Sequence, residues 1–140
     1  MKFSISQKDL QESLGFCQNV IERRSTLPIL SNVLIDVSNS ELTMTATDLD
    51  LVFIHKIKNI EITEEGKTTT SSSIMYDIVR KISSGKKINF SNDAETKLNL
   101  ESENSVFNLN CISASEFPLT EENFNDNQFE INSRDLLKLL

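Results

Sequence analysis

The chain has few of the residues from which small catalytic and cross-linked sites are usually built. Its 140 residues include three glycines, two prolines, two cysteines, one histidine and no tryptophan. So few glycines leave no glycine-rich loop that could cradle a phosphate. Cys17 and Cys111 match no disulfide-framework or metal-ligand spacing. We therefore expect two reduced, structural cysteines, no metal site and no cofactor.

A long hydrophobic run is also missing. No apolar stretch reaches the roughly 20 residues of a membrane-spanning helix. The opening residues 1–9 have no apolar segment behind their charge, which argues against a secretory signal. Hydrophobic residues still make up 38% of the chain, enough for a packed core without disulfides or metals. We expect a soluble, cytoplasmic protein.

Charge is abundant but unevenly distributed. The formal net charge is −7, which argues against a general nucleic-acid binder. Nine acidic residues and one base lie between Asp93 and Glu130. Elsewhere the bases gather in the pairs Arg23-Arg24, Arg80-Lys81 and Lys86-Lys87. This segregation favours an acidic body that meets phosphates on one surface, although ordinary solvated faces also account for such short runs.

Hydrophobic periodicity predicts an α+β domain in which each of two helices is followed by strands. The first helix is expected to begin after the cap Ser6 and to end near Arg23. The second is expected to begin within residues 71–73 and to stop at Gly85. The predicted strands cover residues 2–5, 33–38, 42–47, 49–57, 60–63, 87–90, 98–100 and 106–112, with turns at 39–40, 64–67, 92–93 and 103–104.

Residues 128–140 repeat the pattern of residues 2–14 at a fixed offset of 126 residues. The matched pairs include Phe3 with Phe129, Ile5 with Ile131, Ser6 with Asn132, Leu10 with Leu136 and Leu14 with Leu140. A self-match at a fixed offset indicates a repeated unit, although two strand-to-helix starts can also be similar by chance. We predict one unit over residues 1–120, a linker over 121–127 and the start of a truncated second unit over 128–140.

Candidate catalytic groups are sparse. A cysteine nucleophile at position 17 or 111 would need His55 as its base, and no flanking motif supports that pairing. His55 is better explained as a structural residue of a strand. Asp48 and Asp50 share a predicted strand face and could hold a divalent cation, but solvated carboxylates at a strand end are the simpler interpretation. We expect no active site.

Three motifs together resemble the bacterial β sliding clamp family, the β subunit of DNA polymerase III. They are Arg-x-Thr-Leu-Pro-Ile-Leu-x-Asn at residues 24–32, Thr-Ala-Thr-Asp-Leu-Asp at residues 45–50 and Glu-Phe-Pro at residues 116–118. The resemblance extends over residues 1–140, and its first part matches the family's N-terminal domain. It implies an α+β DNA-clamp fold, with two helices packed on antiparallel β-sheets, as one domain of a ring.

The resemblance implies a function without catalysis. Members of the family form head-to-tail homodimeric rings of three similar domains per subunit, with helices lining the hole. As processivity factors they encircle duplex DNA, contact its phosphates without reading bases, and tether DNA polymerase III. A nucleotidyltransferase classification of such a subunit would reflect the polymerase complex that it serves. The implied partners are duplex DNA, a second subunit, the polymerase and the clamp loader. In the family, the pocket that binds peptides of the polymerase and the clamp loader lies between the second and third domains, outside this chain.

The resemblance also implies roles for individual residues. Arg24 and Arg80 match basic positions that face DNA, although an exposed arginine after a helix is the ordinary alternative. Four residues match an edge strand and the helix packed beside it, where the neighbouring subunit binds: Ile78, Ile82, Phe107 and Leu109. Their alternative is an ordinary core, because alternate apolar residues of a strand usually face inward.

Two other functions remain open on the sequence. One is a protein-interaction scaffold that never encircles DNA, which the net charge of −7 would favour if the basic pairs were scattered over the surface. The other is a small metal-dependent enzyme built on Asp48 and Asp50.

Overall fold

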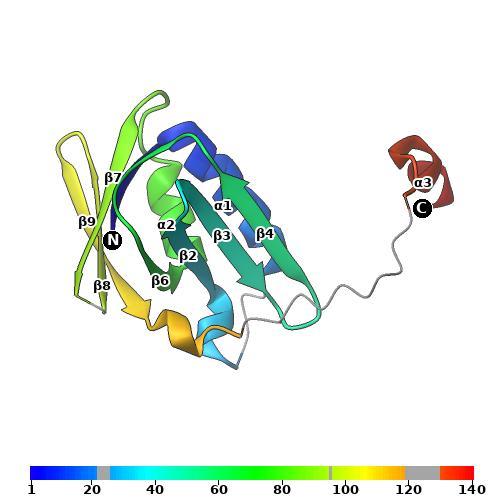
Figure 1. The fold of residues 1–140 in the computed structure, drawn as a ribbon, viewed down its shortest axis with the longest axis horizontal. Coiled ribbons are helices and arrows are strands. Elements are labelled where there is room, and N and C mark those ends of the chain that lie inside the picture. Colours follow the sequence, from blue (N-terminus) through cyan, green and yellow to red (C-terminus); the bar gives the residue numbers. More distant parts are fainter. Residues whose placement is uncertain (22–25, 95, 119–129) are drawn as a thin grey trace.

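Two helices lie against a long row of antiparallel strands, and a third helix follows near the end of the chain (Figure 1). The structure is a computed structural model that describes residues 1–21, 26–94, 96–118 and 130–140. Its elements are β1 (Lys2–Ser6), α1 (Gln7–Val20), the 3₁₀ helix η1 (Pro28–Ser31), β2 (Asn32–Ser38), β3 (Glu41–Thr47), β4 (Val52–Ile57), β5 (Ile60–Glu64), β6 (Gly66–Ser71), α2 (Ser72–Val79), β7 (Lys87–Ala94), β8 (Lys97–Ser102), β9 (Ser105–Ile112), the 3₁₀ helix η2 (Ala114–Glu116) and α3 (Ser133–Leu139).

Both helices of the body begin where the sequence predicts. The hydroxyls of Ser6 and Ser71 each accept a hydrogen bond from the backbone N–H three residues further on, at 3.1 and 3.4 Å. These bonds satisfy donors that the first helical turn leaves unpaired. α1 ends at Val20, earlier than predicted, because Ile21 already has the extended backbone angles φ −72° and ψ 123°.

In the described residues the strands form one antiparallel sheet in the order β4-β3-β2-β6-β9-β8-β7-β1-β5. Two residue pairs join β6 to β9, Thr69 with Ile112 and Thr70 with Cys111. β9 pairs with β8 over the longer range 105–110. β9 therefore belongs to both halves of the sheet, which Figure 1 shows on either side of α2. The predicted α+β class, with helices packed on antiparallel strands, is confirmed.

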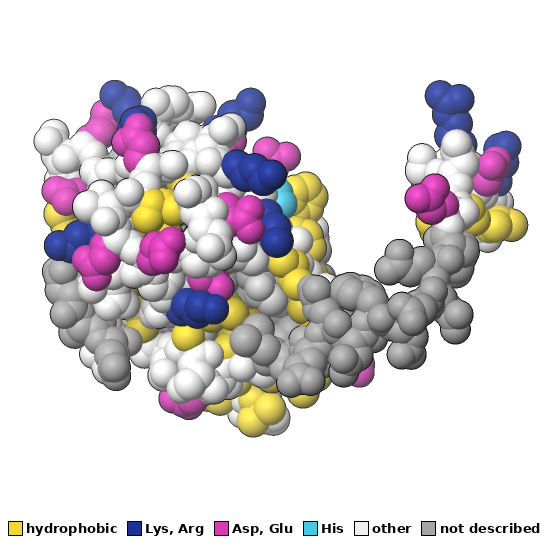
Figure 2. Space-filling view, in the orientation of Figure 1, with side chains coloured by type: hydrophobic (Ala, Val, Ile, Leu, Met, Phe, Trp, Pro, Cys, Tyr) yellow, Lys and Arg dark blue, Asp and Glu magenta, His cyan; other side chains and the backbone are white. Residues whose placement is uncertain are grey.

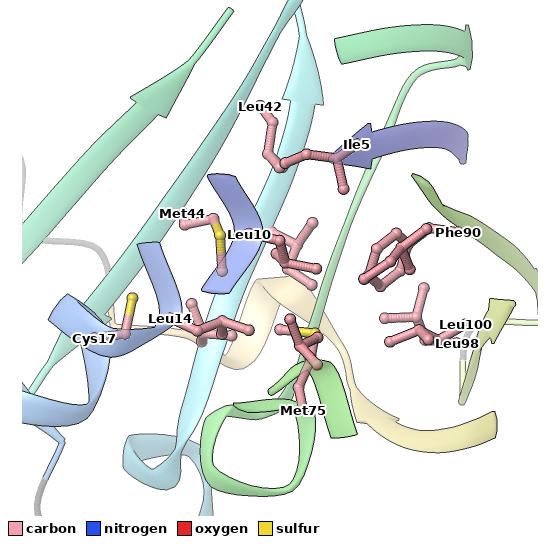
Figure 3. Packing of buried hydrophobic residues seen from close by; sticks show 14 of the residues in the cluster. Ile5, Leu10, Leu14, Cys17, Leu42, Met44, Met75, Phe90, Leu98 and Leu100 are labelled. Atoms are coloured by element: carbon pink, nitrogen blue, oxygen red, sulfur yellow. The ribbon is translucent and has the colours of Figure 1, made fainter. Parts of the chain in front are cut away.

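The apolar stripe of α1 packs into the core as its periodicity predicts (Figure 3). Leu10 and Leu14 are 1% and 0% exposed and lie near Met44 of β3, while Met75 of α2 enters the same cluster from the second helix. Phe90 of β7 adds a side chain from the other half of the sheet. Burial of side chains of this size stabilises a fold by about 1.5–3 kcal/mol each, so α1 depends on both halves of the sheet.

The strand β6 is missing from the sequence prediction, which places a turn at residues 64–67 and a helix start at 71–73. Its segment Lys-Thr-Thr-Thr-Ser has no apolar alternation, so hydrophobic periodicity does not detect it. Thr68, Thr69 and Thr70 are nevertheless 2%, 0% and 0% exposed. Threonine is β-branched and favours strands, and this propensity is the signal that could have found β6.

Three predicted boundaries are also wrong. The strand predicted over residues 49–57 begins at Val52, because Leu49 has a φ of +82° in the preceding turn. α2 ends at Val79, and Gly85, its predicted stop, has a φ of +84° in a separate turn before β7. The turn predicted at residues 92–93 lies within β7, where the pairing with β8 shifts register.

Residues 128–140, which repeat the pattern of residues 2–14, include a third helix. α3 follows the predicted cap Asn132, whose Oδ1 accepts a hydrogen bond from the backbone N–H of Arg134 at 3.0 Å. All residues from 130 to 140 are exposed, and Figure 1 shows α3 apart from the body. Phe129 and the predicted linker 121–127 lie outside the described residues. Across the described ranges, none of the helices is both long and apolar enough to span a membrane.

Candidate nucleic-acid and subunit interfaces

α1 and α2 lie side by side and are joined by two polar contacts. Gln7 Nε2 donates to the carbonyl of Val79 at 3.0 Å, and Gln18 Nε2 donates to Ser72 Oγ at 2.7 Å. The start of α1 is thus bonded to the end of α2, and the end of α1 to its start. The two helices therefore form an antiparallel pair that presents one common face.

A groove of about 670 Å³, lined by both polar and apolar side chains, runs along this helix pair. Its lining includes three amides, two bases and one acid: Gln7, Gln11, Asn19, Lys8, Arg80 and Glu12. Amide and basic side chains donate hydrogen bonds to phosphate oxygens without distinguishing bases. The groove thus has the chemistry for weak contact with a nucleic-acid backbone.

Of the two arginines predicted to face DNA, the structure describes Arg80 alone. Arg80 lines the groove, and its Nε lies 3.3 Å from Asp77 Oδ1, with both side chains more than half exposed. A surface ion pair of this kind contributes about 1 kcal/mol or less, so a phosphate can compete for the guanidinium. Arg24 lies outside the described residues, as does its neighbour Arg23.

The strand side of the molecule carries both signs of charge. Figure 2 shows acidic and basic side chains interspersed over the face on which β2, β3 and β4 lie in front of α1. Ion pairs connect neighbouring strands there, with Lys56 Nζ 3.4 Å from Glu41 Oε1 and Lys67 Nζ 2.8 Å from Asp36 Oδ2. The bases on this side are therefore partly neutralised by acids on the adjacent strands.

A second cavity, of about 440 Å³, lies between α2 and β9. Its apolar lining comes from Ile74 and Ile78 of α2, Ile82 just beyond the helix, and Phe107 of β9. Ile74 is 54% exposed, a large unpartnered apolar area for one side chain. The structure therefore brings three of the four predicted interface residues together around one apolar opening.

The fourth predicted interface residue belongs to the core. Leu109 is 6% exposed and lies in the main hydrophobic cluster. This agrees with the alternative interpretation, in which the apolar residues of this strand face the core. The backbone of its strand is nevertheless open on one side. Residues 105–109 pair with β8, and no other described strand pairs along their second edge. An unpaired edge beside an apolar cavity can accept a strand from another unit.

The carboxylates considered as a metal site have a local structural role. Asp48 and Asp50 do not share a strand face, because they lie in the turn between β3 and β4. Asp48 Oδ1 accepts hydrogen bonds from the backbone N–H groups of Asp50 and Leu51, at 3.0 and 2.7 Å, which closes this turn. In the described part of the chain, no three His, Cys, Asp or Glu side chains gather as metal ligands would.

The histidine and the cysteines are also in structural positions. His55 Nδ1 lies 3.0 Å from Ser13 Oγ, and its ring packs against the rings of Phe16 and Phe53. Burial raises the pKa of the Cys17 thiol to about 12, and burial also raises the pKa of Cys111. A nucleophilic cysteine needs a lowered pKa, so these thiols are poorly suited to nucleophilic attack.

The chain is similar in sequence and structure to proteins of the DNA polymerase III beta subunit family. The family model for the DNA polymerase III beta subunit, N-terminal domain, matches residues 1–121. The beta sliding clamp of Caulobacter vibrioides is 33% identical over 142 residues, which cover all of this chain and 38% of that protein. The beta sliding clamp of Escherichia coli K12 is 31% identical over 131 residues, covering 94% of this chain and 34% of that protein.

Solved structures show the same similarity. The Caulobacter crescentus polymerase III beta structure superposes with a TM-score of 0.93 at 33% identity, covering 99% of this chain and 37% of that one. The Pseudomonas aeruginosa DNA polymerase III beta subunit gives a TM-score of 0.93 at 31% identity, with 99% and 37% covered. The chain therefore spans a little over a third of the length of the relatives that it matches.

Proposed function

The chain belongs to the DNA polymerase III beta subunit family, whose N-terminal domain it matches, and we propose that it forms one segment of a ring around duplex DNA. In this proposal the full-length protein is a processivity factor. It joins a second subunit head to tail, is loaded by a clamp loader, and tethers DNA polymerase III to its template. Members of this family act as processivity subunits and are not catalytic themselves.

The observation that carries the proposal is the face formed by α1 and α2. Its groove combines amides and bases with one acid, and these side chains can donate to phosphate oxygens whatever the base sequence. Such contacts are weak and replaceable, which lets a closed ring slide. Arg80 is the proposed phosphate contact on this face, and Arg24, which lies outside the described residues, is a second proposed phosphate contact.

A second part of the proposal assigns the α2–β9 side to the neighbouring subunit. Ile78, Ile82 and Phe107 would bury their apolar surface against it, and the open edge of β9 would pair with one of its strands. Leu109 would support this surface from the core. A free strand edge next to an apolar opening is a costly surface to leave in water, which supports a partner there.

The proposed domain division follows the sequence pattern that residues 2–14 and 128–140 share. Residues 1–120 form one clamp unit, 121–127 a linker, and 128–140 the start of a second unit. The family match over residues 1–121 supports the first boundary. The cap Asn132 supports the last, because it begins α3 at the position that corresponds to Ser6 before α1.

Topology distinguishes a ring from an ordinary DNA binder. The full-length protein is loaded onto nicked circular DNA with its clamp loader, and the bound fraction is measured before and after the circle is linearised. A ring stays on circles and slides off cut ends. Equal retention on both forms contradicts the proposal, and absence of loading favours a protein-interaction scaffold instead.

A pair of single substitutions tests the proposed DNA face in the same assay. Arg80→Ala is expected to lower the salt concentration at which the ring leaves circular DNA, because about one phosphate contact per subunit is lost. Lys56→Ala is the matched control, since Lys56 lies on β4 and pairs with Glu41 on the strand side. An equal effect of both substitutions would indicate general electrostatics rather than contact by the helix face.

A further inference from the structure

Three polar side chains that the proposed contacts leave unused form a seam between β6 and β9. Thr70 Oγ1 donates to the carbonyl of Asn110 at 2.9 Å, and Thr69 Oγ1 donates to the carbonyl of Ile112 at 2.7 Å. Asn32 Nδ2 donates in turn to Thr69 Oγ1 at 3.1 Å. The backbones of β6 and β9 are paired at two residue pairs, and the threonine hydroxyls add side-chain hydrogen bonds to the backbone of β9 at the same place.

The seam holds β9 from both of its faces. Successive side chains of a strand point to opposite sides of the sheet, so Thr69 and Thr70 reach β9 from different faces. Both threonines are 0% exposed and Asn32 is 6% exposed, while the carbonyls that accept from the threonines belong to the exposed Asn110 and the half-buried Ile112. A buried hydroxyl that loses its acceptor keeps the cost of its desolvation, so the two buried threonines favour the arrangement in which the carbonyls of β9 face them.

The seam is also the point from which the two walls of the α2–β9 cavity diverge. α2 begins at Ser72, directly after the threonines of β6, and carries Ile74 and Ile78 away from the seam. Because β6 and β9 are antiparallel, β9 traced back from Asn110 to Phe107 leaves the seam in the same sense as α2. The angle between the two walls is therefore set where β6 holds β9.

From this arrangement we infer that Asn32, Thr69 and Thr70 are positioning residues for the subunit interface. They hold the open edge of β9 at the angle that keeps the cavity ready for the neighbouring subunit. This inference rests on the proposed function, because it takes the α2–β9 side as the interface. It also assigns a role to Asn32, the last residue of the Leu-Pro-Ile-Leu-Ser-Asn motif.

The test compares Thr69→Val and Thr70→Val with Thr47→Val in the full-length protein. Valine keeps the shape and strand preference of threonine and removes the hydroxyl. Thr47 is a matched control, because it is 1% exposed and its Oγ1 bonds to the turn before β4, donating to the carbonyl of Leu51 at 2.9 Å and accepting from the backbone N–H of Leu49 at 3.0 Å. Chemical unfolding curves first identify conditions in which all variants are folded. Sedimentation equilibrium under those conditions then measures the subunit dissociation constant of each variant.

Each seam variant is expected to raise the subunit dissociation constant by at least about fivefold over the Thr47→Val control, the equivalent of one lost hydrogen bond. Thr69→Ser, which restores a hydroxyl, is expected to return the dissociation constant towards the parent value. Equal dissociation constants for the seam and control variants overturn the inference, because the threonines then contribute stability alone.

Amide hydrogen exchange on the same variants tests the positioning role of the seam separately from the proposed ring. Residues 105–110 of β9 are expected to exchange faster in Thr70→Val than in Thr47→Val, in the monomer as well as the ring. A parent protein that never dimerises contradicts the proposed ring. Unchanged exchange in β9 contradicts the positioning role of the seam, whether or not a ring forms.

Discussion

Two segments of this chain, residues 2–14 and 128–140, share one sequence pattern, but the leucines of their helices lie in opposite environments. In the first, Leu10 and Leu14 are 1% and 0% exposed; in the second, their counterparts Leu136 and Leu140 are 42% and 95% exposed. Both segments form a capped helix after a short lead-in. The pattern therefore specifies the helix and its apolar stripe, whereas burial requires a surface to pack against.

That surface is present for α1 and comes from distant parts of the chain. Met44 of β3, Met75 of α2 and Phe90 of β7 belong to the cluster that encloses its leucines. α3 has seven residues, and a helix of that length is marginal in water without tertiary contacts. The expected contribution of each segment to stability is therefore very different.

Truncation of a leucine in each segment is expected to give the largest contrast. Leu14→Ala removes a fully buried side chain and should lower the free energy of unfolding of the 140-residue chain by about 3 kcal/mol. Leu140→Ala should change it by less than about 0.5 kcal/mol. Urea unfolding measures both. Leu14→Met, which keeps most of the volume, should cost less than about 1.5 kcal/mol; equal costs for Leu14→Ala and Leu140→Ala would remove the distinction between the segments.

Alkaline pH is expected to weaken the buried segment next, through Cys17, which lies one turn beyond Leu14. Burial raises the pKa of its thiol from 9.0 to about 12 in the folded protein. Between these values the unfolded chain releases the proton and the folded chain keeps it. The free energy of unfolding should therefore fall as pH rises above 9, by up to about 1.4 kcal/mol per pH unit.

Cys17→Ala separates this titration from that of the lysines. Unfolding curves of the parent and the variant, measured between pH 8 and pH 11, should differ in slope, with the variant losing less stability. Cys111, whose pKa burial also raises, accounts for a smaller part of the decline that remains. Parallel curves would mean that the thiol of Cys17 is solvated in the folded protein.

Removal of the helix caps is expected to give the smallest effect. Ser6→Ala should lower the free energy of unfolding by about 1 kcal/mol, because the N–H of Asp9 loses its acceptor. Asn132→Ala should leave that quantity unchanged and reduce only the helical signal of residues 133–139, measured by NMR chemical shifts. A drop in global stability from Asn132→Ala would show that α3 packs on the body.

The success of the sequence prediction follows the same division. The caps Ser6, Ser71 and Asn132, the stripe of α1 and the α+β class are local or periodic properties, and the structure confirms them. The strand β6 is missed because its burial is carried by threonines, whose polarity conceals the strand from hydrophobic periodicity. The turn at Leu49 is misjudged because hydrogen bonds from Asp48 Oδ1, which periodicity does not reveal, close it, and the carbonyl at the end of α2 is bound by Gln7 of α1.

The candidate sites divide in a comparable way. The family resemblance implied an interface role for Ile78, Ile82 and Phe107, and the structure places them around one cavity. Leu109 has the same alternation as Phe107 along β9, yet it lies in the core. Alternation assigns a residue to a face of a strand, but only packing determines how far along that face the core extends.

By itself, the sequence determined the family, the helix starts and the apolar stripe of α1, because short-range hydrogen bonding and side-chain periodicity depend on neighbouring residues. Tertiary structure alone decided that Thr69 and Thr70 hold β9, that α2 lies beside α1, and that the leucines of one echo are buried while those of the other are exposed. These outcomes depend on contacts between residues far apart in the chain, and no local pattern encodes which surfaces will meet.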